Sequence, residues 1–207
     1  MNRVPSAAIK RLSLYVKQLS RLMDEGEGVV LSKELAYRLG LNPTQVRKDL
    51  SYFGRFGRRK KGYDVEALHA SLRKVLGVST HNRISIFGAG NLGRALLGFR
   101  GFEERGYVVE GVFDTDDDKI GKLFHGKRCY SIKEAKKIIK EKEVTIAILA
   151  VPDEAVESVL ESVLDAGIKS ILNFTQRRLR VPENVMVRSV DFTDKLESLS
   201  YFSKHKG

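Results

Sequence analysis

Three glycines at a fixed spacing are the first residues of this sequence whose types suggest a specific chemistry. The segment Gly88-Ala89-Gly90-Asn91-Leu92-Gly93 follows a short apolar run and precedes a stretch that favours a helix. In such a segment the first glycine permits a tight turn, the second lets the backbone approach a pyrophosphate, and the third lets the helix pack against the strand. The N–H groups that open the helix then meet the phosphate charge. The pattern predicts a dinucleotide site, with all six residues as candidate cofactor contacts.

A carboxylate lies at the spacing that a dinucleotide site requires. A second strand is predicted over 108–113, and Asp114 follows it, 21 residues beyond Gly93. An acidic residue at this point accepts hydrogen bonds from the adenosine ribose and disfavours the 2′-phosphate of NADP. Three further aspartates at 116–118 add negative charge, although such a run is also typical of a solvated turn. NADH and NAD are therefore the predicted cofactors.

The ends of two later strands are candidates to border the nicotinamide. The continuously apolar run 144–151 predicts a strand buried on both faces, and a further strand is predicted over 170–172. Ligands of doubly wound sheets bind outside the carboxyl ends of the strands. The residues at these two ends are Val151, Pro152, Asn173 and Phe174.

Side chains for proton transfer do not accompany this site. A dehydrogenase needs a proton donor or acceptor beside the nicotinamide, but no tyrosine has a lysine four residues later and no histidine lies at a predicted strand end. The four histidines are scattered and Cys129 is the single cysteine, so we predict no catalytic residue, no metal site and a buried thiol. A cofactor that is sensed is favoured. The alternatives are an NAD-dependent oxidoreductase with a basic accessory domain and a CoA- or nucleotide-binding module.

Basic charge is concentrated upstream of the glycine segment. Of the net charge of +11, residues 1–79 carry +9, with 16 Lys and Arg against 7 Asp and Glu, and residues 80–207 carry +2. Such asymmetry indicates an anionic polymer as the partner of the first third, most simply nucleic acid. A solvated basic face without a partner would have the same composition.

The basic third has the pattern of a helix-turn-helix. One helix is predicted from Pro5-Ser6 to Gly26, with apolar residues at helical spacing. A second begins at a Ser32 N-cap, and a third begins at an Asn42 cap with proline at its first position. Only Gly40-Leu41-Asn42 joins the second helix to the third, and a tight glycine turn between short helices is typical of DNA readers.

The third helix carries different side chains on its two faces. Val46, Leu50 and Phe53 recur at i, i+4 and i+7 and should face the core. On the other face, arginine and glutamine can pair with guanine and adenine edges, and lysine, serine and tyrosine suit phosphates. Asp49 is expected to pair with a neighbouring Arg or Lys, since phosphate repels a carboxylate. The predicted DNA contacts of this helix are Thr44, Gln45, Arg47, Lys48, Ser51 and Tyr52.

A basic hairpin follows the third helix. Residues 54–65 read GRFGRRKKGYDV, with glycines on either side of four consecutive cations. This composition is typical of a wing, which lies along the DNA backbone or enters a minor groove. Asp64 can then cap a closing helix that ends at Gly77. The predicted wing contacts are Arg58, Arg59, Lys60 and Lys61, and a helical protein-interaction module is the alternative for this part of the chain.

Strands and helices alternate after the polar joint at 78–82. Helices are predicted from the glycine segment to about Phe102 and over 132–142 and 153–166, and a last strand over 185–190. This order predicts a Rossmann-type doubly wound parallel sheet. The fold class is therefore α/β, with a winged helix-turn-helix followed by that sheet.

The predicted elements define three parts of the chain. Residues 1–79 form the DNA-binding domain, 80–190 the NAD(H)-binding domain and 191–207 a helix whose apolar stripe could pack on its own domain or on a partner subunit. Arg11 and Asp191 are candidates for an ion pair between domains. Neither a membrane span nor a signal peptide is recognisable, so a cytoplasmic protein is expected.

Several motifs in combination resemble the Rex family of redox-sensing transcriptional repressors. They are QVRKDLSYFG, the FG…GY wing, FGAGNLGRAL, FDTD…KIGK, AVP, AGIKSILNF and VDF. The resemblance implies a homodimer that binds palindromic operator DNA, compares NADH with NAD and leaves the DNA when NADH binds. It also implies that the last helix is exchanged between subunits, which would place the partner's Phe192 at the nicotinamide. Lys60, Asp153 and Thr175-Gln176 depart from the family pattern.

Overall fold

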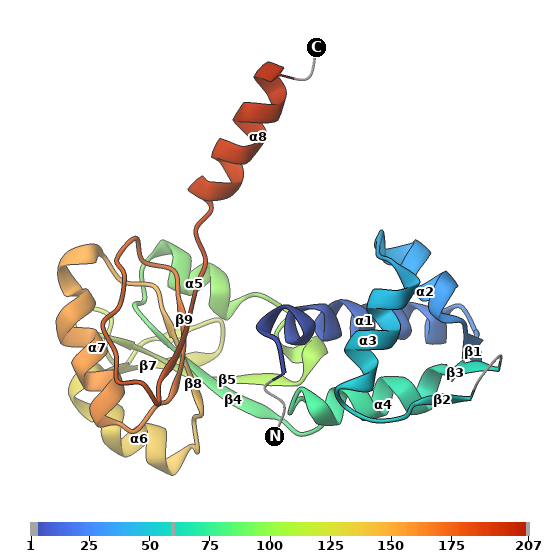
Figure 1. The fold of residues 1–207 in the computed structure, drawn as a ribbon. Coiled ribbons are helices and arrows are strands. Elements are labelled where there is room, and N and C mark those ends of the chain that lie inside the picture. Colours follow the sequence, from blue (N-terminus) through green and yellow to red (C-terminus); the bar gives the residue numbers. More distant parts are fainter. Residues whose placement is uncertain (1–3, 59–60, 206–207) are drawn as a thin grey trace. The chain divides into compact units, whose positions relative to one another are not determined.

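The structure is a computed structural model that describes residues 4–58 and 61–205. Its internal contacts divide the chain into two compact units, Met1–Thr80 and His81–Gly207. Both are drawn in Figure 1. Each unit has a hydrophobic core of its own.

The first unit is a winged helix-turn-helix, as predicted. Its helices are α1 (Ser6–Asp24), α2 (Ser32–Leu39), α3 (Pro43–Ser51) and α4 (Val65–Val75). A small antiparallel sheet in the order β1-β3-β2 joins β1 (Val29–Val30), β2 (Gly57–Arg58) and β3 (Gly62–Asp64). β2 and β3 form the wing. β1 was not predicted, because two paired residues are too few to show a periodic pattern.

Local sequence signals set most helix boundaries of this unit. Gly40 ends α2 with a φ of 63°, a left-handed conformation that costs glycine little. The Asn42 side chain accepts a hydrogen bond from the backbone N–H two residues later at 2.8 Å, and Pro43 is the first helical residue of α3. Asp64 caps α4 through the N–H three residues later, also at 2.8 Å. These predicted caps are confirmed.

The predicted cap at Ser32 is wrong. Ser32 is the first residue of α2, Leu31 occupies the N-cap position, and no side chain caps this helix. The Ser32 hydroxyl instead accepts a hydrogen bond from Arg47 Nη1 of α3 at 3.1 Å. A tertiary contact between the two helices of the motif therefore uses the group that the local pattern assigned to the cap.

The apolar stripes predicted for the first unit form its core. Val46 and Leu50 of α3 are buried and Phe53 is half-buried, which confirms the predicted inner face of the helix. Met23 is exposed, so the stripe of α1 ends at the preceding leucine. The buried leucines that belong to the same core cluster are Leu12, Leu19 and Leu22 of α1 and Leu68 and Leu72 of α4.

The second unit contains a seven-stranded sheet in the order β10-β9-β8-β4-β5-β7-β6. All neighbours are parallel except β6 and β7, which form an antiparallel hairpin. β4 lies between β5 and β8, so the chain reverses its direction across the sheet beside β4. The strands are β4 (Asn82–Phe87), β5 (Tyr107–Asp114), β6 (Leu123–Phe124), β7 (Lys127–Ser131), β8 (Ile146–Leu149), β9 (Ser170–Asn173) and β10 (Met186–Ser189).

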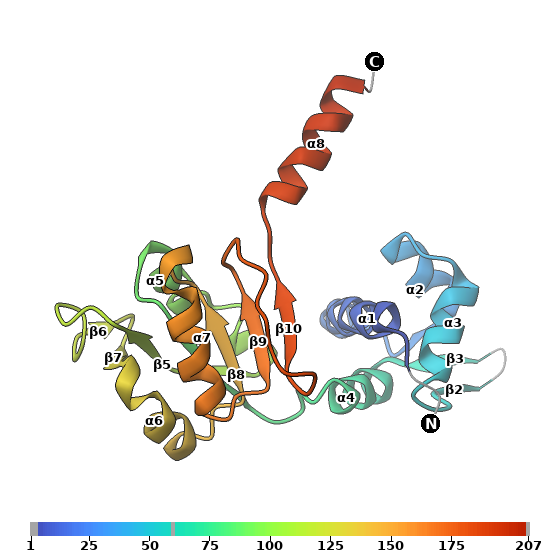
Figure 2. The ribbon, with the colours of Figure 1, turned by 60° about the vertical axis from the view of Figure 1, so that its left-hand side comes forward.

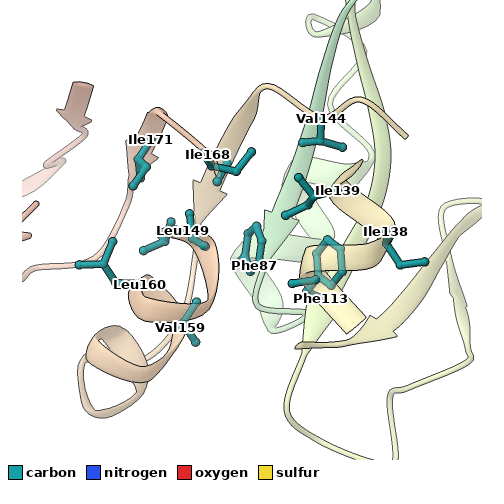
Figure 3. Packing of buried hydrophobic residues seen from close by; sticks show 13 residues of the cluster. Phe87, Phe113, Ile138, Ile139, Val144, Leu149, Val159, Leu160, Ile168 and Ile171 are labelled. Carbon is teal, nitrogen blue, oxygen red and sulfur yellow. The ribbon is translucent and has the colours of Figure 1, made fainter. Parts of the chain in front are cut away.

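Helices cover both faces of this sheet (Figure 2). Successive strand residues point to opposite faces, so Phe87 enters one buried cluster and Ile86 the other. Figure 3 shows the first cluster, where Phe87 and Phe113 stack at 4.8 Å between ring centroids. The helices are α5 (Asn91–Leu97), η1 (Glu103–Arg105), η2 (Ile132–Glu134) with α6 (Ala135–Glu141), η3 (Asp153–Ala155) with α7 (Val156–Asp165), and α8 (Thr193–His205). The doubly wound sheet is therefore confirmed.

Some boundaries differ from the predicted ones. α5 ends at Leu97 rather than near Phe102, because Gly98 follows and glycine supports a helix poorly. The strand predicted over 144–151 is confined to β8, and the β6–β7 hairpin was not predicted. Cys129 lies in β7 and is fully buried, and burial raises the pKa of its thiol to about 11, which fits the predicted packing role.

α8 stands clear of the sheet in Figures 1 and 2, and none of its residues is buried.

Among the described residues, no helix is long and apolar enough to cross a bilayer. Within the same residues, no group of three His, Cys, Asp or Glu side chains is arranged to hold a metal ion.

Candidate functional site

The glycine segment forms a loop between β4 and α5, and each glycine has its own structural reason. Gly88 has a φ of 104°, and a side chain there would overlap the carbonyl of Ala150. A side chain on Gly93 would overlap the carbonyl of Gly88. These two glycines thus allow a turn and a close helix–strand contact that a Cβ atom would prevent.

Gly90 is different, because nothing lies within 4 Å of the position where its Cβ would be. It precedes the first residue of α5, and no side chain caps that helix. The backbone at Gly90 therefore opens onto free space, with Asn91 and Leu92 at the start of the helix. This is the geometry that a phosphate group needs in order to approach main-chain N–H groups.

Asp114 lies next to this loop, at the end of β5. Its Oδ2 accepts a hydrogen bond from Ala89 N at 2.7 Å, and its Oδ1 accepts one from Asp116 N at 2.9 Å. The side chain is 10% exposed. The predicted carboxylate is therefore beside the glycine loop and also holds the loop in place, a second role that the spacing alone did not indicate.

Lys119 is a residue of this site that sequence reasoning missed. Its Nζ lies 3.4 Å from Asp114 Oδ2 and 3.1 Å from Asp116 Oδ2. The Lys119 ammonium group, through its hydrogen bond, lowers the pKa of Asp116. The negative charge around Asp114 is thus partly neutralised by a cation five residues further on, within the KIGK motif.

The ends of β8 and β9 meet the glycine loop at the same edge of the sheet. Ala150 N donates to Phe87 O at 2.8 Å, and Phe174 N donates to Leu149 O at 3.0 Å. The Val151 side chain approaches the position of a Gly88 Cβ to 2.9 Å. The structure therefore brings Val151 and Phe174 to the loop, as expected from parallel strands.

Asn173 is positioned differently from the other strand-end residues. It is fully buried, and its amide donates to Arg177 O at 3.0 Å and Ser189 Oγ at 3.3 Å. Its Oδ1 accepts from Thr175 N at 3.0 Å and Thr175 Oγ1 at 2.7 Å. Both N–H groups are thus used inside the protein, so the side chain supports the turn that carries Phe174.

Two phenylalanines form an apolar surface at this edge. The rings of Phe174 and Phe192 lie 6.2 Å apart within the same chain, whereas the partner's Phe192 was expected here. Phe192 is 59% exposed, Val151 is half-buried and Pro152 is exposed. An apolar group of a ligand could bind against this surface.

The first unit presents the second candidate site, on α3. Thr44, Arg47, Lys48 and Ser51 are exposed, and Gln45 and Tyr52 are half-buried. Arg47 is held in place, since its Nη1 donates to Ser32 Oγ at 3.1 Å and its Nη2 to Thr44 Oγ1 at 2.9 Å. A fixed guanidinium group on an exposed helix face is suited to bidentate recognition.

Asp49 lies on the inner side of α3 and is fully buried. It pairs with Arg11 of α1, whose Nε and Nη2 donate to its carboxylate at 2.5 and 2.8 Å. The predicted basic partner of Asp49 is confirmed, and it is Arg11. The Arg11–Asp191 pair between the domains stays a prediction. Within its own unit, Asp191 accepts a hydrogen bond from Thr193 N, the first residue of α8, at 2.8 Å.

The wing lies beside α3 across a cleft of about 550 Å³. Lys61 is exposed in the turn just before β3, the second wing strand. The side chain of Arg58 and the whole of Arg59 and Lys60 lie outside the described part of the chain. Two basic residues that sequence reasoning missed, Lys33 and Arg55, line the cleft together with Arg47.

Family models match both parts of the chain. Residues 3–51 match a model described as "Putative DNA-binding protein N-terminus", and residues 79–177 match one described as "CoA binding domain". The second description corresponds to one of the alternatives drawn from the sequence, but it covers only part of the chain, whereas full-length relatives distinguish between the alternatives.

The chain is similar over nearly its whole length to redox-sensing transcriptional repressors named Rex. It is 43% identical to the Rex of Carboxydothermus hydrogenoformans, with 96% of each chain covered, and 42% identical to Rex 1 of Thermotoga maritima, with 96% and 95% covered. A crystal structure of RSP with β-NAD⁺ and operator DNA matches with a TM-score of 0.93 at 32% identity, covering 100% of this chain and 95% of that one. RSP with β-NADH matches with a TM-score of 0.88 at 30% identity, covering 100% and 97%. The chain therefore belongs to the Rex family of redox-sensing transcriptional repressors.

Proposed function

We propose that this protein is a repressor that senses the ratio of NADH to NAD, binds a palindromic operator as a homodimer and leaves it when NADH binds. The observation that carries the proposal is the presence, in one chain, of an exposed basic recognition helix and an open glycine loop beside a carboxylate. The related structures that contain NAD⁺ with operator DNA, or NADH, support it. The decisive experiment is release of a preformed operator complex by NADH but not by NAD.

The open loop fits a dinucleotide. The N–H groups of Gly88 and Ala89 already donate to Phe113 O and Asp114 Oδ2 and shape the loop. Main-chain N–H groups of Gly90 and the first turn of α5 would hold the pyrophosphate, and Asp114 would accept from the adenosine ribose. Asp114 also disfavours a 2′-phosphate, although Lys119 weakens this repulsion. We assign residues 1–79 to DNA binding, 80–190 to the nucleotide and 191–207 to dimerisation.

We infer that the cofactor is sensed and not consumed. The side chains at the ends of β8 and β9 are apolar or, in Asn173, already hydrogen-bonded within the protein. None of them is an acid or base suited to transfer a proton beside a nicotinamide. A regulator of operator DNA that samples free NADH would act in the cytoplasm.

Gly90→Ala should weaken NADH binding about tenfold or more while leaving the melting temperature of the protein unchanged. The added methyl group meets no atom of the protein, but it occupies the space through which a pyrophosphate reaches the loop, and a lost hydrogen bond to a charged group is worth about 1.5–3 kcal/mol. Calorimetric titration with NADH measures the effect. Gly28→Ala is the matched control, because Gly28 is equally open and lies in the other unit. Equal NADH affinity in both variants would contradict the assignment of the loop.

Arg47→Ala should reduce affinity for the operator by about 1–3 kcal/mol, with a smaller effect on unrelated DNA, because a bidentate contact to guanine is lost. Lys61→Ala should weaken binding to all DNA sequences alike, since a lysine of the wing contacts phosphate. It should also reduce the salt dependence of DNA binding by about one counterion. Fluorescence anisotropy at several salt concentrations separates these outcomes. The recognition face would be wrongly assigned if both variants bound operator as the wild type does.

A further inference from the structure

A fully buried carboxylate on the recognition helix is the feature that the proposed function leaves unexplained. Asp49 is 0% exposed and lies in α3 between the apolar residues that pack on α1. Burying a charge is costly unless partners replace the water that it loses. Apolar residues would pack there without that cost, so the role of Asp49 is best sought in the directional bonds that it makes.

Four donor groups surround this carboxylate. Arg11 donates two hydrogen bonds, Tyr15 Oη donates to Oδ2 at 2.7 Å, and Gln45 Nε2 donates to Oδ1 at 2.7 Å. Burial raises the pKa of Asp49 while these hydrogen bonds lower it, and the pKa remains below its ordinary value. Asp49 is therefore ionised near neutral pH and can only accept hydrogen bonds.

The donors come from two helices, and this fixes the rotation of α3. Arg11 and Tyr15 belong to α1, one turn apart, whereas Gln45 belongs to α3, one turn before Asp49. Apolar contacts would tolerate a small rotation of α3 about its axis, but a bidentate arginine pair and a tyrosine bond have strict geometry. The outward side chains of α3 are thereby set at a fixed angle.

The carboxylate also fixes which way the Gln45 amide points. Because Asp49 accepts only, the Gln45 nitrogen and not its oxygen must face it. One N–H of Gln45 is used in this bond, and the second N–H and the carbonyl oxygen remain. These two groups, side by side, are what a glutamine uses to pair with an adenine edge in the major groove.

We propose that Asp49 is a positioning residue that sets sequence specificity: held by Arg11 and Tyr15, it orients the Gln45 amide to read one adenine of the operator. The inference rests on the proposed function of α3 as the recognition helix. According to this proposal, a buried residue determines which base is preferred at a single base pair of the DNA. A residue that only stabilised the fold would not have this effect.

The test compares Asp49→Asn, Gln45→Ala and the double variant in the full-length protein. The wild type first selects its preferred duplex from a randomised pool, and each base pair of that duplex is then changed in turn and measured by anisotropy. An amide at position 49 can donate as well as accept, so it no longer dictates the orientation of Gln45. Replacing one particular adenine should lower the affinity of the wild type for the duplex about 5–150-fold. In both single variants the same replacement should leave the affinity unchanged, and the double variant should show no further loss of affinity.

Other outcomes are equally informative. If Asp49→Asn weakens binding to every duplex alike and keeps the adenine preference, Asp49 only stabilises the fold and the inference is wrong. If the wild type selects no duplex at all, the proposed function itself fails. Because removing one partner of a buried ion pair can unfold a domain, Tyr15→Phe serves as a milder variant. It keeps the ring and should relax the preference partly, at the same base pair, whereas an undiminished preference in this folded variant would also overturn the inference.

Discussion

Leu199→Glu should dissociate the proposed homodimer and lower operator affinity by about 10²–10⁴-fold, the gain that joining two binding modules provides. Leu199 is 64% exposed on α8, and Phe192, Leu196 and Phe202 are exposed on the same side of the helix or just before it. Apolar stripes of this kind mark interaction surfaces. A carboxylate in the middle of the stripe would be buried without a partner on association.

Tyr201→Glu is the matched control for this prediction. It also replaces an exposed apolar side chain with a carboxylate, two residues later and about 160° around the helix from Leu199, away from the stripe. Light scattering should show monomers for Leu199→Glu and dimers for Tyr201→Glu. Truncation after Val190 removes the whole helix and should reproduce the effect of Leu199→Glu. If the truncated protein remains a complete dimer, another surface forms the interface.

The link between dimerisation and DNA follows from symmetry. A palindromic operator offers two equivalent half-sites, and a two-fold dimer can place one α3 in each. A monomer keeps every contact of its own α3 and wing but loses the second half-site. Leu199→Glu should therefore bind an isolated half-site as the wild-type protein does, whereas a loss on the half-site as well would indicate damage to the winged helix.

The sequence predictions were accurate where the interacting residues lie close together in the sequence. Asn42, Asp64 and Gly40 were assigned correctly, because caps and left-handed turns are determined by groups a few residues apart. Gly93 also follows from a local contact, with the carbonyl of Gly88. The exposed side chains of α3 could be placed because helical periodicity separates the inner face from the outer one.

Predictions that required contacts between distant residues were less accurate. The hydroxyl of Ser32 bonds Arg47 of another helix, and the partner of Asp49 is 38 positions away in the sequence. Asn173 appeared to be a ligand residue because it follows a strand, but its amide bonds to residues of the following turn and of β10. No periodic pattern encodes such pairings. The extra role of Asp114 as a support for the glycine loop has the same origin.

NADH should release the protein from a preformed operator complex at concentrations at which NAD leaves the complex intact, at matched ionic strength. The two cofactors differ chiefly at the nicotinamide, which is neutral in NADH and positively charged in NAD. The surface formed by Val151, Phe174 and Phe192 is apolar, and burying an unpaired charge against it is costly. The arrangement that encloses the ring should therefore prefer NADH.

The population shift that release requires sets how differently NADH must bind the free and the DNA-bound protein. Moving an equilibrium from about 99% bound to 99% free needs a differential affinity of about 10⁴, which two sites of a dimer supply at about 10² each. Anisotropy of labelled operator during titration with each nucleotide measures it. Gly90→Ala serves as the control, since weaker binding of the pyrophosphate should raise the NADH concentration needed for release about tenfold or more. Equal release by NAD and NADH would contradict redox sensing even if both nucleotides bind.

Reciprocity provides an independent check on the same mechanism. A ligand shifts an equilibrium only through different affinities for the two states, so NADH that weakens DNA binding must itself be bound more weakly by the DNA complex, by the same factor. Calorimetric titration of NADH into the free protein and into the operator complex should therefore differ by the factor found in the release experiment. If the NADH affinities are equal, NADH binding is not coupled to DNA binding, and release must come from the ionic strength of the added nucleotide.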